Sequence, residues 1–260
     1  MKHIFRTLIV AFILFSSSQT FAQIDSTFDD DWENESSFSN TKFGGAGGFT
    51  PYYLFLDMKE LNFFLSRGNV KPFSTNELVM YGGEGYGYIM FLKNVRVGGL
   101  GASGNLASEY YDALSGIKRE VSLEINFSGV TMGYVFPFSR RLDVALDIML
   151  GGGNVDIVLT RSNKQNFVWH EIWSNYGDPT YSENNYTQKI SGNFFTYRYS
   201  FNIEYALLDW FGLRCGLGYT AMVSPEWKLD NKYDLNNVPN NISGKGMTLN
   251  FGIFAGAFGN

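Results

Sequence analysis

The sequence is poor in the residues on which most catalytic and metal-binding sites depend. Its 260 residues include one cysteine and two histidines. Because Cys215 stands alone, an intramolecular disulfide is excluded, and its place in an apolar strand favours a small buried or lipid-facing residue over a nucleophile. His3 lies in the N-terminal leader, and His170 stands in a polar loop with Glu171 and Asp178 nearby. We predict a protein that is not an enzyme, with no metal site and no cofactor.

Positive charge is scarce as well. The chain has 20 lysines and arginines against 25 aspartates and glutamates, which gives a formal net charge of −5. Binding to nucleic acid requires a basic stripe that neutralises phosphates. We therefore predict that nucleic acid is not a partner.

Long hydrophobic runs are missing, apart from one short run near the N-terminus. Lys2 and Arg6 precede the apolar run Leu8–Phe15, and small polar residues lead on to Ala22, which is the pattern of a signal peptide cleaved after Ala22. This run is too short to span a bilayer as a helix. Later apolar stretches are interrupted by glycine or charge, so any membrane span must be a closed barrel. The chain thus divides into a signal peptide (residues 1–22), an acidic, flexible periplasmic segment (23–42) and a barrel domain (43–260).

What the sequence does contain is glycine and aromatic residues, with 29 Gly, 16 Tyr and 24 Phe, a mixture typical of barrel walls. Eight segments are predicted as strands: residues 46–56, 78–92, 95–107, 119–136, 142–160, 189–206, 210–223 and 245–258. The connections between them alternate between long polar loops and short turns, the turns being residues 93–94, 137–141 and 207–209. Outer-membrane barrels have short periplasmic turns and long extracellular loops. The predicted fold class is therefore all-β, a closed antiparallel transmembrane β-barrel of about eight strands.

The strand predicted at 189–206 shows the two faces of the wall most clearly. Its apolar face, which we expect to face the membrane, consists of Tyr197, Tyr199, Phe201, Ile203 and Tyr205. Alternation alone does not say which face is outside, because a soluble secreted barrel that binds a small ligand has the same period with the faces reversed. Tyrosines near both ends of the strand, with Phe201 and Ile203 between them, favour the aromatic girdles of a membrane barrel.

Charged residues fall on the opposite, predicted lumen face of several strands. They are Arg96, Glu120, Glu124, Asp143, Asp147, Arg198, Glu204 and Arg214. An eight-stranded barrel is only just wide enough for side chains to fill it, and buried charges must pair. We predict an interior salt-bridge network that plugs the lumen, with a pore lining as the alternative.

The alternation switches face at Gly129 and at Gly151–Gly153. A β-bulge or the end of a strand would explain such a switch. In the strand predicted at 142–160, the switch would also fit a wall that leaves the bilayer there.

The first long loop contains a predicted amphipathic helix, Asp57–Gly68. Asp57 followed by Glu60 resembles a capping box, and Gly68 is a plausible stop. One helical face carries Leu61, Phe64 and Leu65. We expect this face to pack against the barrel mouth, and a lid or plug is the functional alternative.

The third long loop, Arg161–Gln188, is rich in aromatic residues among small polar ones. They include Trp169, Trp173, Tyr176, Tyr181 and Tyr186. Exposed aromatics of this kind suit recognition of sugars or proteins. A strand pair that extends beyond the membrane with its own small cluster explains the same pattern.

The chain resembles the small eight-stranded outer-membrane barrels of the OmpA-transmembrane and OmpX type. The resemblance is one of architecture, and its most specific part is the C-terminal strand Met247–Phe258, which looks like the signal read by the barrel-assembly machinery. It implies a cell outer-membrane location, contact with outer-membrane lipid and a monomer. Such proteins are structural anchors, adhesins, small pores or, rarely, lipid-modifying enzymes. We expect a structural or surface-recognition role with a plugged lumen, and keep a narrow channel or a transporter of small hydrophobic molecules as the alternative.

Overall fold

The computed structural model describes residues 43–163, 168–170, 173–174 and 185–259. The predicted signal peptide and acidic segment lie outside these residues. The chain divides into two compact units, Met1–Phe38 and Ser39–Asn260, and all of the described residues belong to the second.

The elements named in the described part of the chain are strands and the helix α2. In order they are β1 (Phe43–Phe49), β2 (Tyr52–Phe55), α2 (Lys59–Arg67), β3 (Glu77–Tyr88), β4 (Val95–Asp112), β5 (Ile117–Pro137), β6 (Leu142–Ser162), β7 (Tyr186–Leu208), β8 (Phe211–Leu229), β9 (Tyr233–Asp234) and β10 (Gly246–Gly259).

The strands form one antiparallel ring. Neighbours from β3 to β8 pair in chain order, β8 pairs with β10, and β1 and β2 lie between β10 and β3. β1 and β2 act as one strand, interrupted at Thr50 and Pro51, because proline has no N–H to donate to the ladder. The predicted all-β barrel of eight antiparallel strands, with a helix in the first loop, is confirmed.

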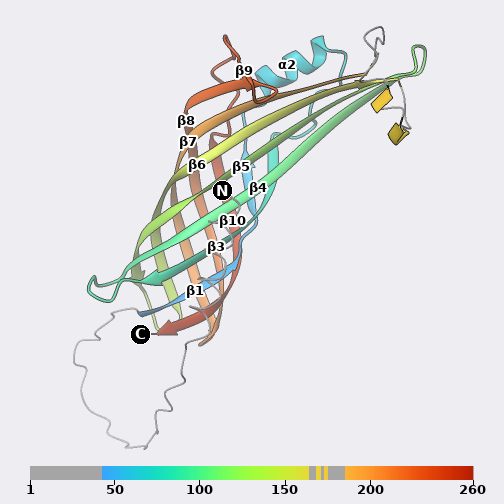
Figure 1. Cartoon of the computed structure of the whole chain (residues 1–260). Coiled ribbons are helices and arrows are strands. Elements are labelled where there is room, and N and C mark those ends of the chain that lie inside the picture. The colour runs from blue at the N-terminus through green and yellow to red at the C-terminus, as the bar shows by residue number, and fades with distance from the viewer. Residues whose placement is uncertain (1–42, 164–167, 171–172, 175–184, 260) are drawn as a thin grey trace, which may run out of the picture. The chain divides into compact units, whose positions relative to one another are not determined.

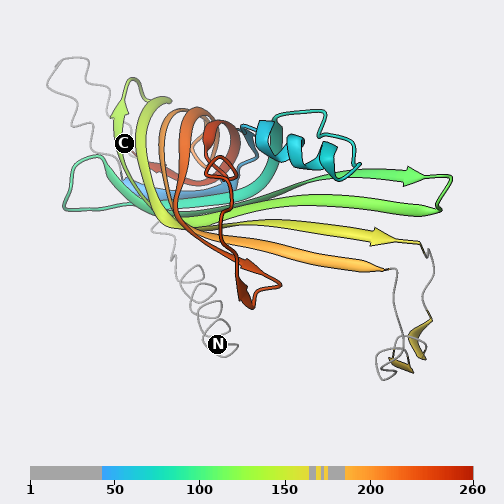
Figure 2. The same cartoon turned by 90° about the horizontal axis from the view of Figure 1, so that it is seen from above.

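Four neighbouring strands continue well beyond the ring. Figures 1 and 2 show β4, β5, β6 and β7 running on together at the end where α2 lies, while β1 begins and β10 ends at the opposite end. β5 and β6 have 21 residues each and β7 has 23, about twice the 9–11 that cross a bilayer. The predicted strands were shorter, because polar residues on the outer face of these ends resemble loop sequence.

The wall changes character partway along each long strand. Opposite one another at this level lie Gly129 of β5 and Gly151 of β6, followed by Thr196 of β7. We call the wall from this level to the short turns the lower half, and the remainder, toward α2, the upper half. A Cβ at Gly151 would collide with the carbonyl oxygen of Ser128, so glycine permits the close strand contact there.

At this level the register shifts between β7 and β8, between Asn193 and Phe195, but not between β5 and β6. The β5–β6 ladder runs unbroken from Lys118 and Ser162 to Pro137 and Asp143. Odd-numbered residues of β5 point inward on both sides of Gly129. A bulge between β5 and β6 is therefore not the cause of the switch in alternation: in these two strands the direction of the side chains continues, and only their chemistry changes.

Helix α2 begins without the predicted capping box. Met58 occupies the N-cap position and makes no side-chain cap hydrogen bond, while the Asp57 carboxylate accepts a bond from the Lys59 N–H. At the other end Gly68 keeps an ordinary φ of −80°, and Asn69 takes the left-handed conformation with φ 53°. The predicted helix and its stop at Gly68 are confirmed, whereas the capping box is wrong and the left-handed residue is Asn69 in place of Gly68.

Candidate functional site

Charged side chains from five strands meet inside the lower half of the ring. Arg96 of β4 lies with Nη2 2.7 Å from Oδ2 of Asp147 on β6 and with Nη1 2.6 Å from Oε1 of Glu204 on β7. Arg214 of β8 lies 2.7 Å from the same Glu204 oxygen and 2.7 Å from Oε1 of Glu84 on β3. β3 and β8 are separated by two other strands of the ring, as are β4 and β7. The ion pairs therefore tie distant parts of the wall together.

These groups are almost completely shielded from water. The side chains of Arg96 and Arg214 are 2% and 1% exposed, and that of Glu204 is 10% exposed. The Tyr86 hydroxyl donates to Glu204 at 3.1 Å, and its ring lies 4.3 Å from the Arg96 guanidinium carbon. The Arg214 contacts are ion pairs without aligned hydrogen bonds. Since a buried charge without a partner costs several kcal/mol, the five charges depend on one another.

A layer of amides extends the network toward the upper half. The Asn202 amide donates to Asp147 at 2.7 Å, and the Asn250 amide donates to Asn202 at 3.2 Å. Arg198 donates to Asn250 at 3.2 Å and to Thr248 at 3.4 Å. Together the two layers link side chains of β3, β4, β6, β7, β8 and β10 across the lower half.

One small cavity borders the network at its short-turn end. A cavity of about 10 Å³ is lined by Asp143, Glu204 and Arg214, among others. That is at most the space of one water molecule.

The structure brings together some of the predicted lumen residues and separates others. Arg96, Asp147, Glu204 and Arg214 form the ion pairs, Arg198 joins the amide layer, and Asp143 lies half-buried on the inner face of β6.

Two predicted lumen residues, Glu120 and Glu124, belong elsewhere. Both lie on the outer face of β5 in the upper half, where Glu120 pairs with Lys118 at 3.3 Å. Their placement on the lumen face was wrong because it assumed that charge always faces inward. That holds only where the outside is lipid.

Sequence reasoning missed Glu84, Tyr86, Asn202 and Asn250. A signal for Glu84 was present, because it is the one charged residue in the glycine-rich stretch Tyr81–Tyr88, and it has the same parity as Tyr86. The amides had a signal too, because alternation places Asn202 on the face of Arg198 and Glu204, and Asn250 on that of Thr248, but only charged residues were counted in the predicted network.

The upper half holds a hydrophobic core in place of charges. The inward residues of β5, Val121, Leu123, Ile125 and Phe127, pack with Val155 and Ile157 of β6 and with Trp227 of β8. Helix α2 adds Leu61 and Leu65 to this core, while Phe64 is 46% exposed. The expected packing of the helix on the barrel mouth is thus observed for two of the three residues of its predicted face.

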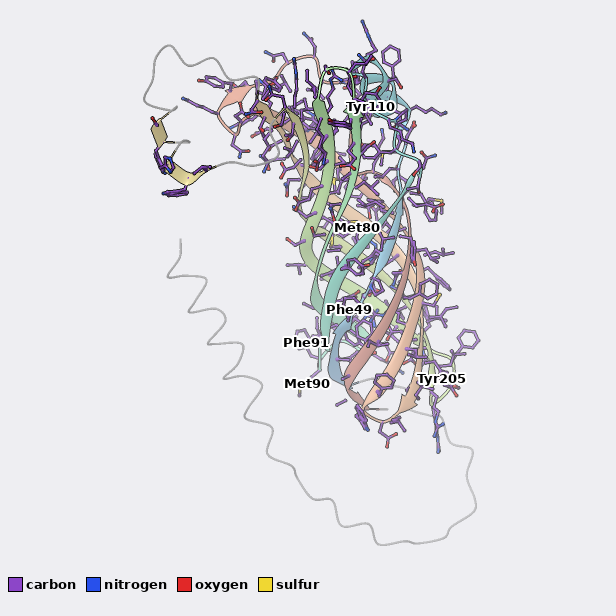
Figure 3. All side chains as sticks on the ribbon, turned by 90° about the vertical axis from the view of Figure 1, so that its right-hand side faces the viewer. Phe49, Met80, Met90, Phe91, Tyr110 and Tyr205 are labelled. Carbon is purple, nitrogen blue, oxygen red and sulfur yellow. The ribbon has the colours of Figure 1, made fainter. Side chains whose placement is uncertain are left out.

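The predicted membrane-facing residues of β7 do point outward. Tyr199, Phe201, Ile203 and Tyr205 are exposed, and Tyr197 is half-buried with its ring against Tyr199. Figure 3 places Tyr205 near the short turns, together with Met90 and Phe91, and Tyr110 at the other end. Met90 and Phe91 are 91% and 85% exposed, so apolar side chains continue onto the turns.

The aromatic loop is described only in part. Trp169 and Trp173 are exposed and pack edge to face with ring centroids 5.7 Å apart, and Tyr186, also exposed, begins β7. Tyr176 and Tyr181 lie outside the described residues.

In the described part of the chain, no helix is long and apolar enough to span a membrane. Within the same residues, no group of three or more His, Cys, Asp or Glu side chains is placed to hold a metal ion.

Comparisons with known proteins find likeness in structure only. No protein-family model matches the chain, and no curated protein matches it in sequence. The attachment invasion locus protein Ail of Yersinia pestis, solved with the heparin analogue sucrose octasulfate, is 8% identical with a TM-score of 0.40, over 84% of this chain and 99% of Ail. The N-terminal β-barrel domain of Pseudomonas aeruginosa OprF is 12% identical with a TM-score of 0.36, over 82% and 96%. A major outer membrane protein of Thermus thermophilus is 9% identical with a TM-score of 0.43, over 82% and 98%.

Proposed function

We propose that this chain is a monomeric outer-membrane β-barrel with a closed lumen, which presents the upper half of its wall outside the cell as a recognition surface. The observation that carries the proposal is that side chains occupy the interior of the ring in both halves. The ion pairs of Arg96, Glu204 and Arg214 close the lower half, and the hydrophobic core closes the upper half.

The outer face of the lower half supports a location in the membrane. Its outward residues are apolar on successive strands: Met132 and Tyr134 on β5, Leu146 and Ile148 on β6, Phe201 and Ile203 on β7, Leu213 and Leu217 on β8, and Phe251 and Ile253 on β10. In water such a continuous belt would drive aggregation, whereas in lipid it is the expected surface. A soluble secreted barrel would not expose it.

The orientation follows from loop length and assembly. Short turns join β3 to β4, β5 to β6 and β7 to β8, and the long hairpins lie at the other end. Outer-membrane barrels keep short turns in the periplasm, so the upper half and α2 face outward. In this proposal β10 is the strand that the barrel-assembly machinery reads.

Two measurements test the proposal. Protein reconstituted in planar bilayers should give no steady conductance, and regular conductance steps would support the channel alternative instead. In a Cys215→Ser background, a cysteine at Leu114, on the tip of the β4–β5 hairpin, should react with an impermeant maleimide on intact cells. The matched control, a cysteine at Phe138 in the β5–β6 turn, which is also exposed, should react only after the outer membrane is permeabilised. The reverse pattern would refute the orientation.

A further inference from the structure

The upper half contains a sizeable cavity that the core does not fill. It has a volume of about 590 Å³ and lies between α2 and the ends of β5, β6 and β7. Cavities of about 300–1,000 Å³ are typical of small-molecule sites. This cavity is separate from the ion pairs of the lower half, because the hydrophobic core lies between them.

The walls of the cavity are apolar. Leu61, Phe64 and Leu65 contribute from α2, Val121 from β5 and Leu159 from β6. Phe64, which is partly exposed on α2, lines one side of the cavity. Such walls suit a hydrocarbon chain, since burying apolar surface is favourable and demands no specific polar partner.

Two arginines lie side by side among the lining residues. Arg119 of β5 and Arg161 of β6 are direct partners across the ladder, and Tyr186 of β7 is the next partner of Arg161. Like charges directly opposite one another destabilise a strand pair. This arrangement therefore costs stability in the free protein, and an anion between the two guanidinium groups would offset that cost.

The acidic groups nearby are already engaged. Glu120 also lines the cavity, and its carboxylate lies 3.3 Å from Lys118, which it shares with Glu109 at 2.6 Å. Asp112, whose pKa is lowered mainly by the Ser115 hydroxyl and slightly by Arg119, accepts bonds from Ser115 and from the Leu114 N–H. The carboxylates nearby thus have partners other than Arg161, and the place suited to an anion is the pair of guanidinium groups itself.

We propose that this cavity binds a single-chain anionic amphiphile of the fatty-acid class. The alkyl chain lies against the leucines and Phe64, and the carboxylate lies between Arg119 and Arg161. The ligand comes from the aqueous side, because Val121 lies eight residues beyond Gly129, about 26 Å along β5 from the lower half. A lipid anchored in the bilayer would not reach it. The inference deepens the proposed function, since it rests on the upper half being outside the cell.

The test is equilibrium binding of radiolabelled palmitate to the full chain in lipid nanodiscs, with binding to empty nanodiscs subtracted. The double variant Arg119→Ala/Arg161→Ala should bind palmitate about tenfold more weakly or worse, as expected for loss of charge-assisted hydrogen bonds. The control Lys228→Ala/Lys232→Ala removes the same charge away from the cavity and should bind like the wild type. Equal binding by both double variants would overturn the carboxylate site.

A second pair of variants tests the chain-binding cavity. Leu159→Trp fills it and should abolish binding of both palmitate and uncharged hexadecanol, whereas Val158→Trp, on the outer face of the same strand, should not. Heat-modifiable gel mobility shows that each variant is folded. Unchanged binding by a folded Leu159→Trp protein would refute the cavity as the site.

The outcomes also separate this inference from the proposed function. Absence of palmitate binding in a barrel that neither conducts nor admits solutes would refute only the amphiphile site. Palmitate delivered through the wall into the interior of vesicles would instead refute the closed lumen.

Discussion

The two halves of strand β5 share one register and one direction of side chains, yet their chemistry is opposite. In the upper half, Ile125 and Phe127 point inward while Glu124 points outward. In the lower half, Thr131 points inward while Met132 and Tyr134 point outward. The same reversal occurs in β6. The reversal indicates that the surroundings of the wall decide which face of a strand carries apolar side chains. A wall in lipid carries them on its outer face, and a wall in water carries them on its inner face.

The largest effect should come from breaking the lower interior. Glu204→Ala leaves Arg96 and Arg214 buried without their shared carboxylate and should destabilise the barrel by about 3–5 kcal/mol. Urea titration of protein folded into vesicles measures this. As a control, Glu120→Ala removes an outward carboxylate of the upper half and should have little effect. Similar losses in both would contradict the difference between the halves.

The upper interior should respond to lost volume. Phe127 is buried in the hydrophobic core with its ring edge to face with that of Tyr52, so Phe127→Ala should cost about 3–5 kcal/mol through lost contacts and a cavity. Ser128→Ala, at the next residue, which lies on the outer face, is the control in the same urea titration and should leave the free energy of unfolding almost unchanged. A small effect at Phe127 would mean that the upper core is loosely packed.

An arginine placed on the outer face should destabilise the protein more in the lower half than in the upper half. Phe201→Arg on the lower half places a cation in lipid and should cost about 2–4 kcal/mol near the bilayer midplane. Asn126→Arg lies on the outer face of the upper half and should change stability by only a few tenths of a kcal/mol. If the free energy of unfolding fell equally in both variants, the outer faces of the two halves would have the same surroundings, contrary to this account.

The smallest effect concerns the helix that covers the upper core. Leu65→Ala on α2 should cost about 2 kcal/mol, toward the lower limit for buried leucines, because the helix is short and packs on one side only. Phe63→Ala, at an exposed position of the same helix, is the comparison. Proteolysis of the folded protein should become faster only with Leu65→Ala. Equal rates for both would indicate that α2 is not held by its buried face.

The sequence predicted the lower half of the wall more completely than the upper half. In β7 every second residue from Tyr197 to Tyr205 is apolar, and this strand was placed correctly with its faces in the right direction. The ring, and the placing of Arg96 and Glu204 on its inner face, followed from similar alternation. Their pairing could not, because alternation carries no information on which strands face each other.

In the upper half, alternation could not predict which face of a strand points inward, and the reason is physical. Alternation in β5 separates Glu120 and Glu124 from Val121 and Leu123, but it does not state which set is inside. That choice depends on whether the wall is surrounded by lipid or water, and a strand that leaves the bilayer changes surroundings without changing period. The cavity beside α2 was equally hidden, since it arises where two elements far apart in sequence fail to fill the space between them.

The most direct test of the reversal uses two sites on one face of one strand. In the Cys215→Ser background, single cysteines at Met132 and Asn126 carry a polarity-sensitive fluorophore on the outer face of β5, on either side of Gly129. The account predicts that brominated lipid chains quench the label at 132 and leave the label at 126 unaffected, while aqueous iodide does the reverse. Quenching of both labels by the same agent would contradict the claim that this wall passes from lipid to water at Gly129.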